Sequence, residues 1–375
     1  MQTLNLGGTK ATDYTIKLSC DTVVPLLIVN AQIGGKTYRF LFDTGADTVI
    51  TDRLVEETKP RLLDKVPVAD ADGNVDSLNI YSLSEITLDG IEFNDIPAIH
   101  LKESVIMKCL DLDGIIDCNL LRNSVVHFSS PDKVITIADS PEKIKVELSN
   151  PIEMLEISPQ KLPIFKISFV DNNQKDDDLV LYFDSGMNEL LHLSLRSFYY
   201  LRDEGFFVDN IKEGYGSETT TLFGGSQDTV QYKVQIPELE IGNSSIKDVS
   251  INTTTFPNSR IGATLLEYGF VTIDFKNGLF YFDPFSDQEQ KPEKKKLTAS
   301  LASSGDKYRI GIIWDKELRT KISPGNHVLA VDGNSLEGLT ECEVFMGKGL
   351  EEKDSYIFTV KDKNGNIKDI LVKRE

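Results

Sequence analysis

Two tripeptides in this sequence each place an aspartate between an apolar run and a small, tight turn. They read Asp43-Thr44-Gly45 and Asp184-Ser185-Gly186. A carboxylate at the end of a buried strand is unfavourable unless it is paired or hydrogen-bonded. Glycine permits close approach of the backbone, and the hydroxyl groups can fix the loop. Two carboxylates held side by side would share one proton, which allows one to act as general base and the other as general acid.

A single Asp-Ser/Thr-Gly tripeptide is most often an ordinary turn, so the position of both copies matters. Both lie at matching places of an internal repeat, in which five segments recur in the same order. The matched pairs are 25–30 with 163–168, 40–45 with 181–186, 86–90 with 239–242, 120–121 with 265–266, and 126–128 with 271–273. The repeat predicts two homologous β lobes, at 15–145 and 146–285.

Short β-type runs bounded by Gly, Asp, Asn and Pro dominate the sequence, and helical periodicity is scarce. The best helical segments are 193–204 and 341–350. These patterns predict a mostly β protein of sandwich or barrel character, whose strands carry the aspartates at their ends.

The segment 40–50 resembles the active-site segment of retroviral-type aspartic proteases. In that family, two apolar residues and a glycine further along pack under the active-site loop; 261–266 matches this pattern and 115–121 matches it in part. Both copies lie in one chain, as in pepsin-like enzymes. The resemblance implies two acid-protease β-barrel lobes of a bacterial type and an active site formed within a monomer.

The same resemblance implies an aspartic endopeptidase that acts on a peptide or protein substrate without a metal or cofactor. Asp43 and Asp184 would be catalytic, and the loop residues would support them: Thr44, Gly45, Ser185 and Gly186. Water activated by one carboxylate would attack the peptide carbon, while the other carboxyl group donates to the carbonyl oxygen. Which aspartate carries the proton is a property of the pair.

Such enzymes close a β-hairpin flap over the substrate. Asp72-Gly73-Asn74 has hairpin chemistry at the right place in the first lobe, and Tyr215-Gly216 occupies the corresponding place in the second. Either segment is a candidate flap, and an ordinary surface hairpin is the alternative for each.

Asp117 stands in the first lobe where the family pattern has glycine. A third carboxylate beside the dyad would repel its charge or take up a proton itself. We therefore expect Asp117 either to turn outward or to interact with the dyad and modulate its activity.

The polar, charged segment 286–296 has the composition of a linker, and a small α+β module at 297–375 is expected to follow. Segment 322–336 resembles the core of PDZ domains, with 308–314 near the expected peptide groove. The resemblance implies capture of a C-terminal peptide by strand addition. A PDZ-like module that only packs on the protease remains the alternative.

The formal net charge of −19 disfavours nucleic-acid binding, and no apolar run is long enough to span a bilayer. Four cysteines are too few for a disulfide scaffold. Cys109 and Cys118 are the close pair, which leaves one disulfide between them or four unpaired thiols.

No signal peptide is visible at the start, which fits a cytosolic protein or a chain whose leader has been removed. We expect an extracytoplasmic location, in the periplasm or at the cell surface. Two other functions stay open: a non-catalytic peptide-binding protein that uses the two-lobed cleft or the PDZ-like groove, and a cytosolic enzyme–scaffold fusion.

Overall fold

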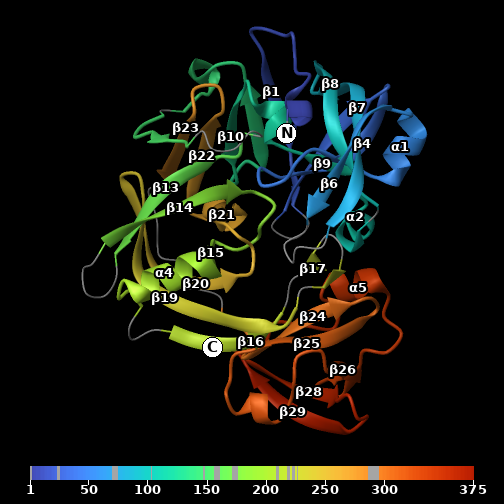
Figure 1. Cartoon of the computed structure of the whole chain (residues 1–375), viewed down its shortest axis with the longest axis vertical. Helices are drawn as coiled ribbons and strands as arrows, with labels where there is room; N and C mark the ends of the chain where they lie inside the picture. Colours follow the sequence, from blue (N-terminus) through green and yellow to red (C-terminus); the bar gives the residue numbers. More distant parts are fainter. Residues whose placement is uncertain are drawn as a thin grey trace.

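The computed structural model describes residues 2–22, 26–69, 75–102, 104–146, 148–155, 161–170, 176–207, 211–217, 220–221, 224–225, 227–285 and 295–375. The fold is mostly β and contains two closed six-stranded barrels, which confirms the predicted pair of acid-protease lobes. A third body, formed by the C-terminal residues, lies beside them (Figure 1). None of the helices in these ranges combines the length and the apolar character that a membrane crossing requires.

The first barrel follows the strand order β3-β4-β9-β5-β8-β7 and closes where β3 meets β7. Its strands are β3 (Leu27–Ile33), β4 (Lys36–Phe42), β5 (Val49–Ile50), β7 (Val75–Leu88), β8 (Ile91–His100) and β9 (Gly114–Ile116). Flanking elements are η1 (Gln2–Asn5), β2 (Asp21–Thr22), α1 (Asp52–Thr58), β6 (Arg61–Ala69), α2 (Val105–Cys109) and α3 (Cys118–Leu121).

The second barrel repeats this order as β13-β14-β21-β15-β20-β19, closed where β13 meets β19. Its strands are β13 (Ile164–Val170), β14 (Asp176–Asp184), β15 (Leu191–Ser194), β19 (Thr229–Ile241), β20 (Ser244–Thr254) and β21 (Ser259–Gly262). Flanking elements are α4 (Leu195–Asp203), β16 (Ile211–Gly216), β17 (Thr220–Thr221), β18 (Gly224–Gly225) and η3 (Ala263–Glu267). In both barrels the strand that ends at the aspartate pairs in parallel with the strand of the downstream apolar segment.

A six-stranded sheet joins the lobes, because each lobe contributes three of its strands. They are β1 (Thr15–Ser19), β10 (Val125–Ser129), β11 (Val134–Ala138), β12 (Ile152–Glu153), β22 (Gly269–Asp274) and β23 (Leu279–Pro284), and η2 (Pro141–Lys143) follows β11. β10 and β22 cross the boundary in register, and there His127 Nδ1 lies 2.8 Å from Thr272 Oγ1. The two lobes therefore share one continuous sheet.

Aromatic side chains pack beneath the two aspartate loops. Phe42 and Phe183, each just before an aspartate, both lie against Phe128, with ring centroids 5.7 and 5.6 Å apart. All three side chains are fully buried. A deeply buried phenylalanine contributes several kcal/mol to the free energy of unfolding. The packing of these three rings therefore holds both aspartate loops in position.

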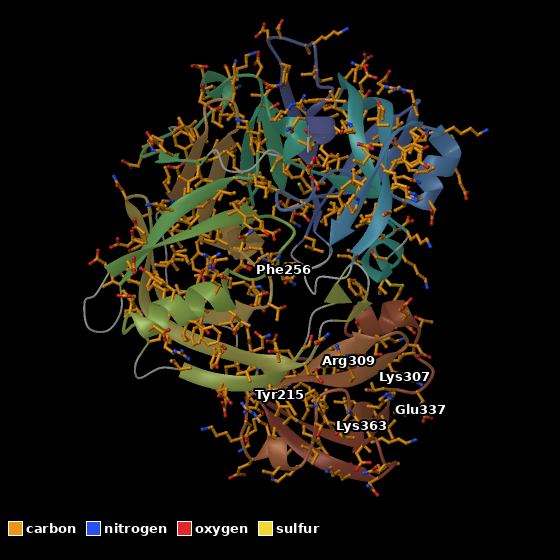
Figure 2. All side chains as sticks on the ribbon, viewed as in Figure 1. Tyr215, Phe256, Lys307, Arg309, Glu337 and Lys363 are labelled. Atoms are coloured by element: carbon orange, nitrogen blue, oxygen red, sulfur yellow. A yellow bond between two sulfur atoms is a disulfide. The ribbon has the colours of Figure 1, made fainter. Side chains whose placement is uncertain are left out.

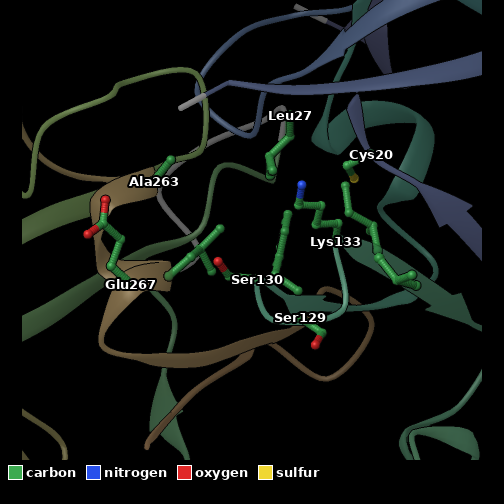
Figure 3. Close-up of a pocket in the computed structure, with 11 residues that line it drawn as sticks. Cys20, Leu27, Ser129, Ser130, Lys133, Ala263 and Glu267 are labelled. Carbon is green, nitrogen blue, oxygen red and sulfur yellow. The ribbon is translucent and has the colours of Figure 1, made fainter. Parts of the chain in front are cut away.

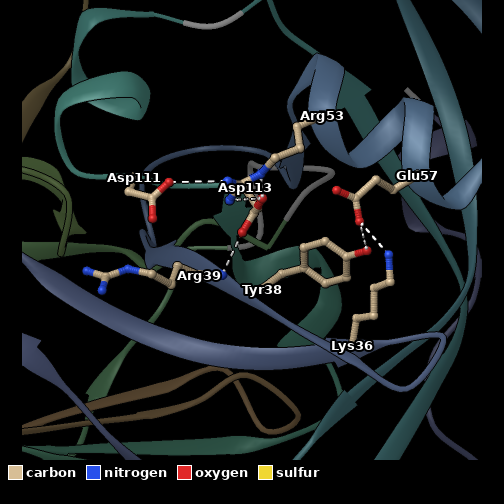
Figure 4. A network of polar contacts seen from close by, with 7 residues as sticks. All are labelled: Lys36, Tyr38, Arg39, Arg53, Glu57, Asp111 and Asp113. Carbon is tan, nitrogen blue, oxygen red and sulfur yellow. Dashed lines mark hydrogen bonds and ion pairs between the residues drawn. The ribbon is translucent and has the colours of Figure 1, made fainter.

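A polar network around the buried Asp113 carboxylate anchors the strand that leads into the first loop (Figure 4). The Asp113 carboxylate accepts from Arg53 Nε at 2.6 Å and from the Arg39 backbone N–H at 2.8 Å. Glu57 on α1 accepts from Tyr38 and Lys36 nearby. The network ties α1, β4 and the start of β9 together, which positions the residues that follow β9.

The C-terminal module has its own core, which lies among its strands and α5. Its elements are β24 (Ala299–Ser304), β25 (Lys307–Ile313), η4 (Leu318–Thr320), β26 (His327–Val331), β27 (Asn334–Ser335), α5 (Glu341–Phe345), β28 (Ser355–Lys361) and β29 (Ile367–Lys373). Most of the predicted linker, 286–294, lies outside the described residues. The domain boundaries themselves stay a prediction.

The module is attached to both lobes. A disulfide joins Cys109, at the end of α2, to Cys342 in α5. In the second lobe, β16 pairs with β25 at Tyr215 and Ile313. The expectation of a Cys109–Cys118 disulfide or of four free thiols was therefore wrong, because folding brings two cysteines 233 residues apart into contact. The two remaining thiols, Cys20 and Cys118, are buried.

Candidate active site

The two Asp-Ser/Thr-Gly loops meet face to face between the lobes. A Cβ placed on Gly45 would lie 2.6 Å from Asp184 Cγ, and one placed on Gly186 would lie 2.4 Å from Asp43 Cγ. No side chain fits in either position, so glycine is required for each loop to pass the opposite carboxyl group. The fold thus brings the two predicted catalytic aspartates together.

Reciprocal hydrogen bonds lock the two loops. Thr44 Oγ1 donates to the Phe183 carbonyl at 2.7 Å and accepts from the Ser185 N–H at 3.0 Å. Ser185 Oγ donates to the Phe42 carbonyl at 2.9 Å and accepts from the Thr44 N–H at 3.0 Å. Both hydroxyl residues are fully buried. Each lobe therefore holds the other's loop, and the carboxyl groups cannot separate without breaking four buried hydrogen bonds.

The surroundings of the dyad act on the pKa of Asp43. Burial, the charge of Asp184 and a hydrogen bond between the carboxyl groups raise the pKa of Asp43 well above its ordinary value. Each carboxylate also accepts from the glycine N–H of its own loop, at 2.8 Å for Asp43 and 3.1 Å for Asp184. The raised pKa of Asp43 fits a pair of carboxyl groups that share one proton.

Arg260 contacts the carboxylate of Asp184, a role that was not predicted from the sequence. Its Nη1 donates to Asp184 Oδ2 at 2.9 Å, and the two side chains are only 13% and 7% exposed. The ring of Phe256 lies 4.2 Å from the guanidinium carbon. A signal was available: the repeat aligns Arg260 with Ile115, so a charged residue in the second lobe stands where the first lobe has an apolar one.

Asp117 is fully buried and caps α3, so the alternative of an outward-facing side chain is wrong. Its Oδ1 accepts from Thr48 Oγ1 at 2.6 Å and from the Leu120 N–H at 3.4 Å. Burial raises the pKa of Asp117 to about 7. Its role as a modulator stays a prediction, and its position makes it a helix cap whose charge is suppressed by desolvation.

The two candidate flaps differ in what the structure describes. Asp72, Gly73 and Asn74 lie outside the described residues, but the arms β6 and β7 pair up to Ala69 and Val75. Tyr215 and Gly216 end β16, which pairs with β19 and also with the C-terminal module. Arg309 of that module, labelled in Figure 2, donates from its Nη1 to the Ser217 carbonyl at 3.3 Å, just beyond the end of β16.

Two other kinds of site, a metal site and a cysteine nucleophile, were considered in the described part of the chain. It contains no group of three His, Cys, Asp or Glu side chains that could hold a metal ion. A cavity of about 110 Å³ contains Cys20, Lys133 and Glu267 in an otherwise mostly apolar lining (Figure 3). Burial raises the pKa of Cys20 to about 11, which makes a poor nucleophile of this thiol.

Residues 29–119 match the family model of aspartyl proteases. The matched region includes the Asp43 loop and Asp117, and it ends before the second lobe. No curated protein sequence matches the chain. The chain has the two-lobed aspartic protease fold, and the match supports aspartic peptidase activity in general.

Proposed function

We propose that this protein is an aspartic endopeptidase in which Asp43 and Asp184 form one catalytic dyad. The observation that carries the proposal is the reciprocal locking of the two loops, which holds the carboxyl groups against each other. A structural turn needs no such arrangement. Thr44, Gly45, Ser185 and Gly186 act as the supports of this dyad.

Catalysis follows from one proton shared by two carboxyl groups. The ionised carboxylate takes a proton from a water molecule as its oxygen attacks the peptide carbon, and the other carboxyl group protonates the carbonyl oxygen. Collapse of the tetrahedral intermediate breaks the C–N bond, and the dyad returns a proton to the leaving amine. The reaction needs no covalent enzyme intermediate.

The hairpin β6–β7 of the first lobe is the better candidate flap. Among the described strands, β6 pairs with β7 alone, so no further strand covers its outer edge. A side-chain hydrogen bond from Thr3 of η1 to Asp64 of β6, at 3.4 Å, is a weaker attachment. The corresponding hairpin of the second lobe is joined to β25 and is also held by an ion pair between Arg319 and Glu213 at 2.9 Å. A flap must move to admit substrate. This requirement favours the hairpin β6–β7, which no third strand joins at its outer edge.

A peptide-binding role for the PDZ-like module is a second proposal. β25, which contains most of the segment expected near the groove, pairs with β24 on one edge and with β26 and β16 on the other. Among the described strands, β24 pairs only with β25 and lies beside α5. Strand addition requires an unpaired edge, so a peptide would bind at β24.

A cavity of about 340 Å³ lies where the module meets the second lobe, and its lining includes Lys296, Leu301 and Arg374. The two cationic side chains suit a peptide carboxylate. Calorimetric titration with a peptide and with its C-terminally amidated form tests this role. The peptide with the free carboxylate should bind more tightly. Equal affinity for both forms would contradict recognition of the C-terminal carboxylate.

An oxidising compartment outside the cytoplasm is proposed for the protein. The Cys109–Cys342 disulfide supports this location, since such bonds persist where thiols are not kept reduced. Alkylation of free thiols in cell extracts, followed by mass spectrometry, should find these two cysteines unmodified; full alkylation of both would contradict the proposal.

The catalytic proposal is tested by peptide hydrolysis with the variants Asp43→Asn and Asp184→Asn. Each side chain keeps its shape but loses its acid–base function, so each variant should lose at least about 10³-fold in kcat/KM. Asp111→Asn, an exposed aspartate of the same lobe as Asp43, is the matched control and should stay active. Substantial activity in either dyad variant, with the fold intact by circular dichroism, would refute the dyad.

A further inference from the structure

The dyad carries a buried positive charge on one side. This charge is the guanidinium of Arg260, and arginine side chains in proteins are always charged. It contacts the Asp184 carboxylate and the face of Phe256, and within the described part of the chain its Nε has no hydrogen-bond partner. Because little water surrounds this pair, its attraction is screened less than that of a surface ion pair.

The first lobe shows the same position without a charge. Arg260 lies opposite Tyr182 in the parallel pairing of β14 and β21, whereas Ile115 lies opposite Leu41 in the pairing of β4 and β9. The charge of Arg260 acts on Tyr182 and lowers the pKa of its hydroxyl, against the larger effect of burial, which raises it. The polar pair of the second lobe therefore replaces an apolar pair of the first, and only Asp184 gains a cationic partner.

We propose that Arg260 is a positioning residue that keeps Asp184 in its ionised form and thereby assigns the shared proton to Asp43. This inference rests on the proposed function of the dyad. Asp184 is then the general base that accepts the proton of the attacking water, and Asp43 donates its proton to the carbonyl oxygen. When the C–N bond breaks, the proton on Asp184 passes to the amine, and a hydroxyl of the intermediate restores the proton of Asp43.

Several other titratable groups surround Arg260 and Asp184. None of them changes the assignment of the shared proton to Asp43. They are Asp43 across the dyad, Tyr182 on β14, His192 on β15 with its partner Glu189, and the first-lobe groups Asp47, Asp117 and Cys118. Burial raises the pKa of Tyr182, Asp47 and Cys118. Burial thus favours the neutral form of these three groups, and among the described residues Arg260 is the cation in contact with the dyad.

The consequence is a dyad that stays active in more acidic solution. A carboxylate beside an arginine ionises about 1–3 pH units lower than one without it. The acid limb of the pH–rate profile, where the dyad gains its second proton, should therefore depend on Arg260.

The test is kcat/KM for peptide hydrolysis over pH 3–8, with urea unfolding of each variant at the same pH values. Arg260→Ile installs the residue that the first lobe has at this position, and its acid limb should move up by about 1–3 pH units. Arg260→Lys restores a positive charge and should bring the limb back most of the way. Arg202→Ile, at an exposed arginine of α4, is the control and should keep the wild-type profile.

A folded Arg260→Ile variant with an unshifted acid limb would overturn the inference. If Arg260→Ile does not fold, Arg260→Gln replaces it with the same expected shift. A second readout works even without hydrolysis: ¹³C NMR titration of Asp43, whose pKa should rise further in Arg260→Ile because Arg260 lowers it. Loss of activity in the Asp43→Asn and Asp184→Asn variants tests the dyad separately, so failure of one proposal is distinct from failure of the other.

Discussion

The two lobes have the same strand order, yet different side chains surround their aspartates. Beside Asp43, the first lobe has apolar Ile115 and, two residues later, the buried acid Asp117. Beside Asp184, the second lobe has Arg260 and, two residues later, Gly262. A Cβ on Gly262 would lie 2.3 Å from the Glu189 carbonyl oxygen, so Asp117 has no possible counterpart there.

This comparison shows how a duplicated scaffold can give two identical groups different roles. The backbone places both carboxyl groups symmetrically, and the side chains one layer away distribute charge unequally. The two hairpins differ as well. The outer strand of β6–β7 pairs with no third described strand, whereas β16 of the hairpin β16–β19 pairs with β25 of the C-terminal module. The first lobe thus contains the candidate flap that we propose, and the corresponding hairpin of the second lobe is joined to the C-terminal module.

The largest expected effect concerns Asp117. With its pKa raised to about 7, the folded state binds the Asp117 proton more tightly than the unfolded state. Its stabilising contribution is therefore full below the unfolded pKa of 3.8 and is lost as pH rises through 7. Asp117→Asn, which can still cap α3, should lack this loss. Its stability relative to wild type should rise by on the order of 4 kcal/mol between pH 3.5 and pH 8, measured by urea unfolding.

The Asp117 prediction has a control variant and an outcome that would contradict it. Glu142→Gln, at an exposed acid of the same lobe, is the control and should show no such rise. A stability difference between Asp117→Asn and wild type that does not change with pH would contradict the buried, protonated state of Asp117.

The next effect concerns the attachment of the C-terminal module. A disulfide and the ion pair between Lys108 and Glu341 join it to the first lobe, whereas a strand pairing and the ion pair between Arg319 and Glu213 join it to the second. Replacing Cys109 and Cys342 by serine should cost about 2–4 kcal/mol in free energy of unfolding. Cys20→Ser, at a buried free thiol, controls for loss of a cysteine alone. Equal stability of the double variant and wild type under oxidising conditions would show that the bond contributes nothing.

The hydroxyl groups that lock the loops test the symmetry of the pair. Thr44→Val and Ser185→Ala each remove a donor and an acceptor, so each should cost about 1–3 kcal/mol in free energy of unfolding and lower kcat. Thr44→Ser and Ser185→Thr keep the hydroxyl and should stay close to wild type. If the conservative pair loses as much activity as the disruptive pair, packing rather than hydrogen bonding holds the loops.

Phe256 provides the smallest and most specific change. Its ring attracts the Arg260 guanidinium by a cation–π contact worth about 0.5–2 kcal/mol. Phe256→Leu keeps an apolar side chain beside Arg260 and should shift the acid limb of the pH–rate profile by less than about one pH unit. A shift as large as that of Arg260→Ile would mean that Phe256, rather than the charge, sets the limb.

Much of this arrangement could be predicted from the sequence because local patterns carry it. The repeated Asp-Ser/Thr-Gly loops and the apolar segments downstream predicted two lobes and a pair of neighbouring aspartates. The Cys109–Cys342 disulfide could not be predicted, since no local pattern relates residues so far apart. Arg260 was overlooked because its partner, Asp184, becomes a neighbour only when two parallel strands align. The capping role of Asp117 likewise depends on Thr48, which the fold brings to it.

The most direct test of the central claim is a ¹³C NMR titration of the Asp43 carboxyl carbon in wild type and in Asp184→Asn. If the two aspartates form one dyad, Asp43 in the wild type titrates well above the ordinary range of an aspartate. Its pKa falls in Asp184→Asn, because the neighbouring charge that raises it is gone. An Asp43 that titrates in the ordinary range and does not respond to Asp184→Asn would contradict a shared-proton dyad.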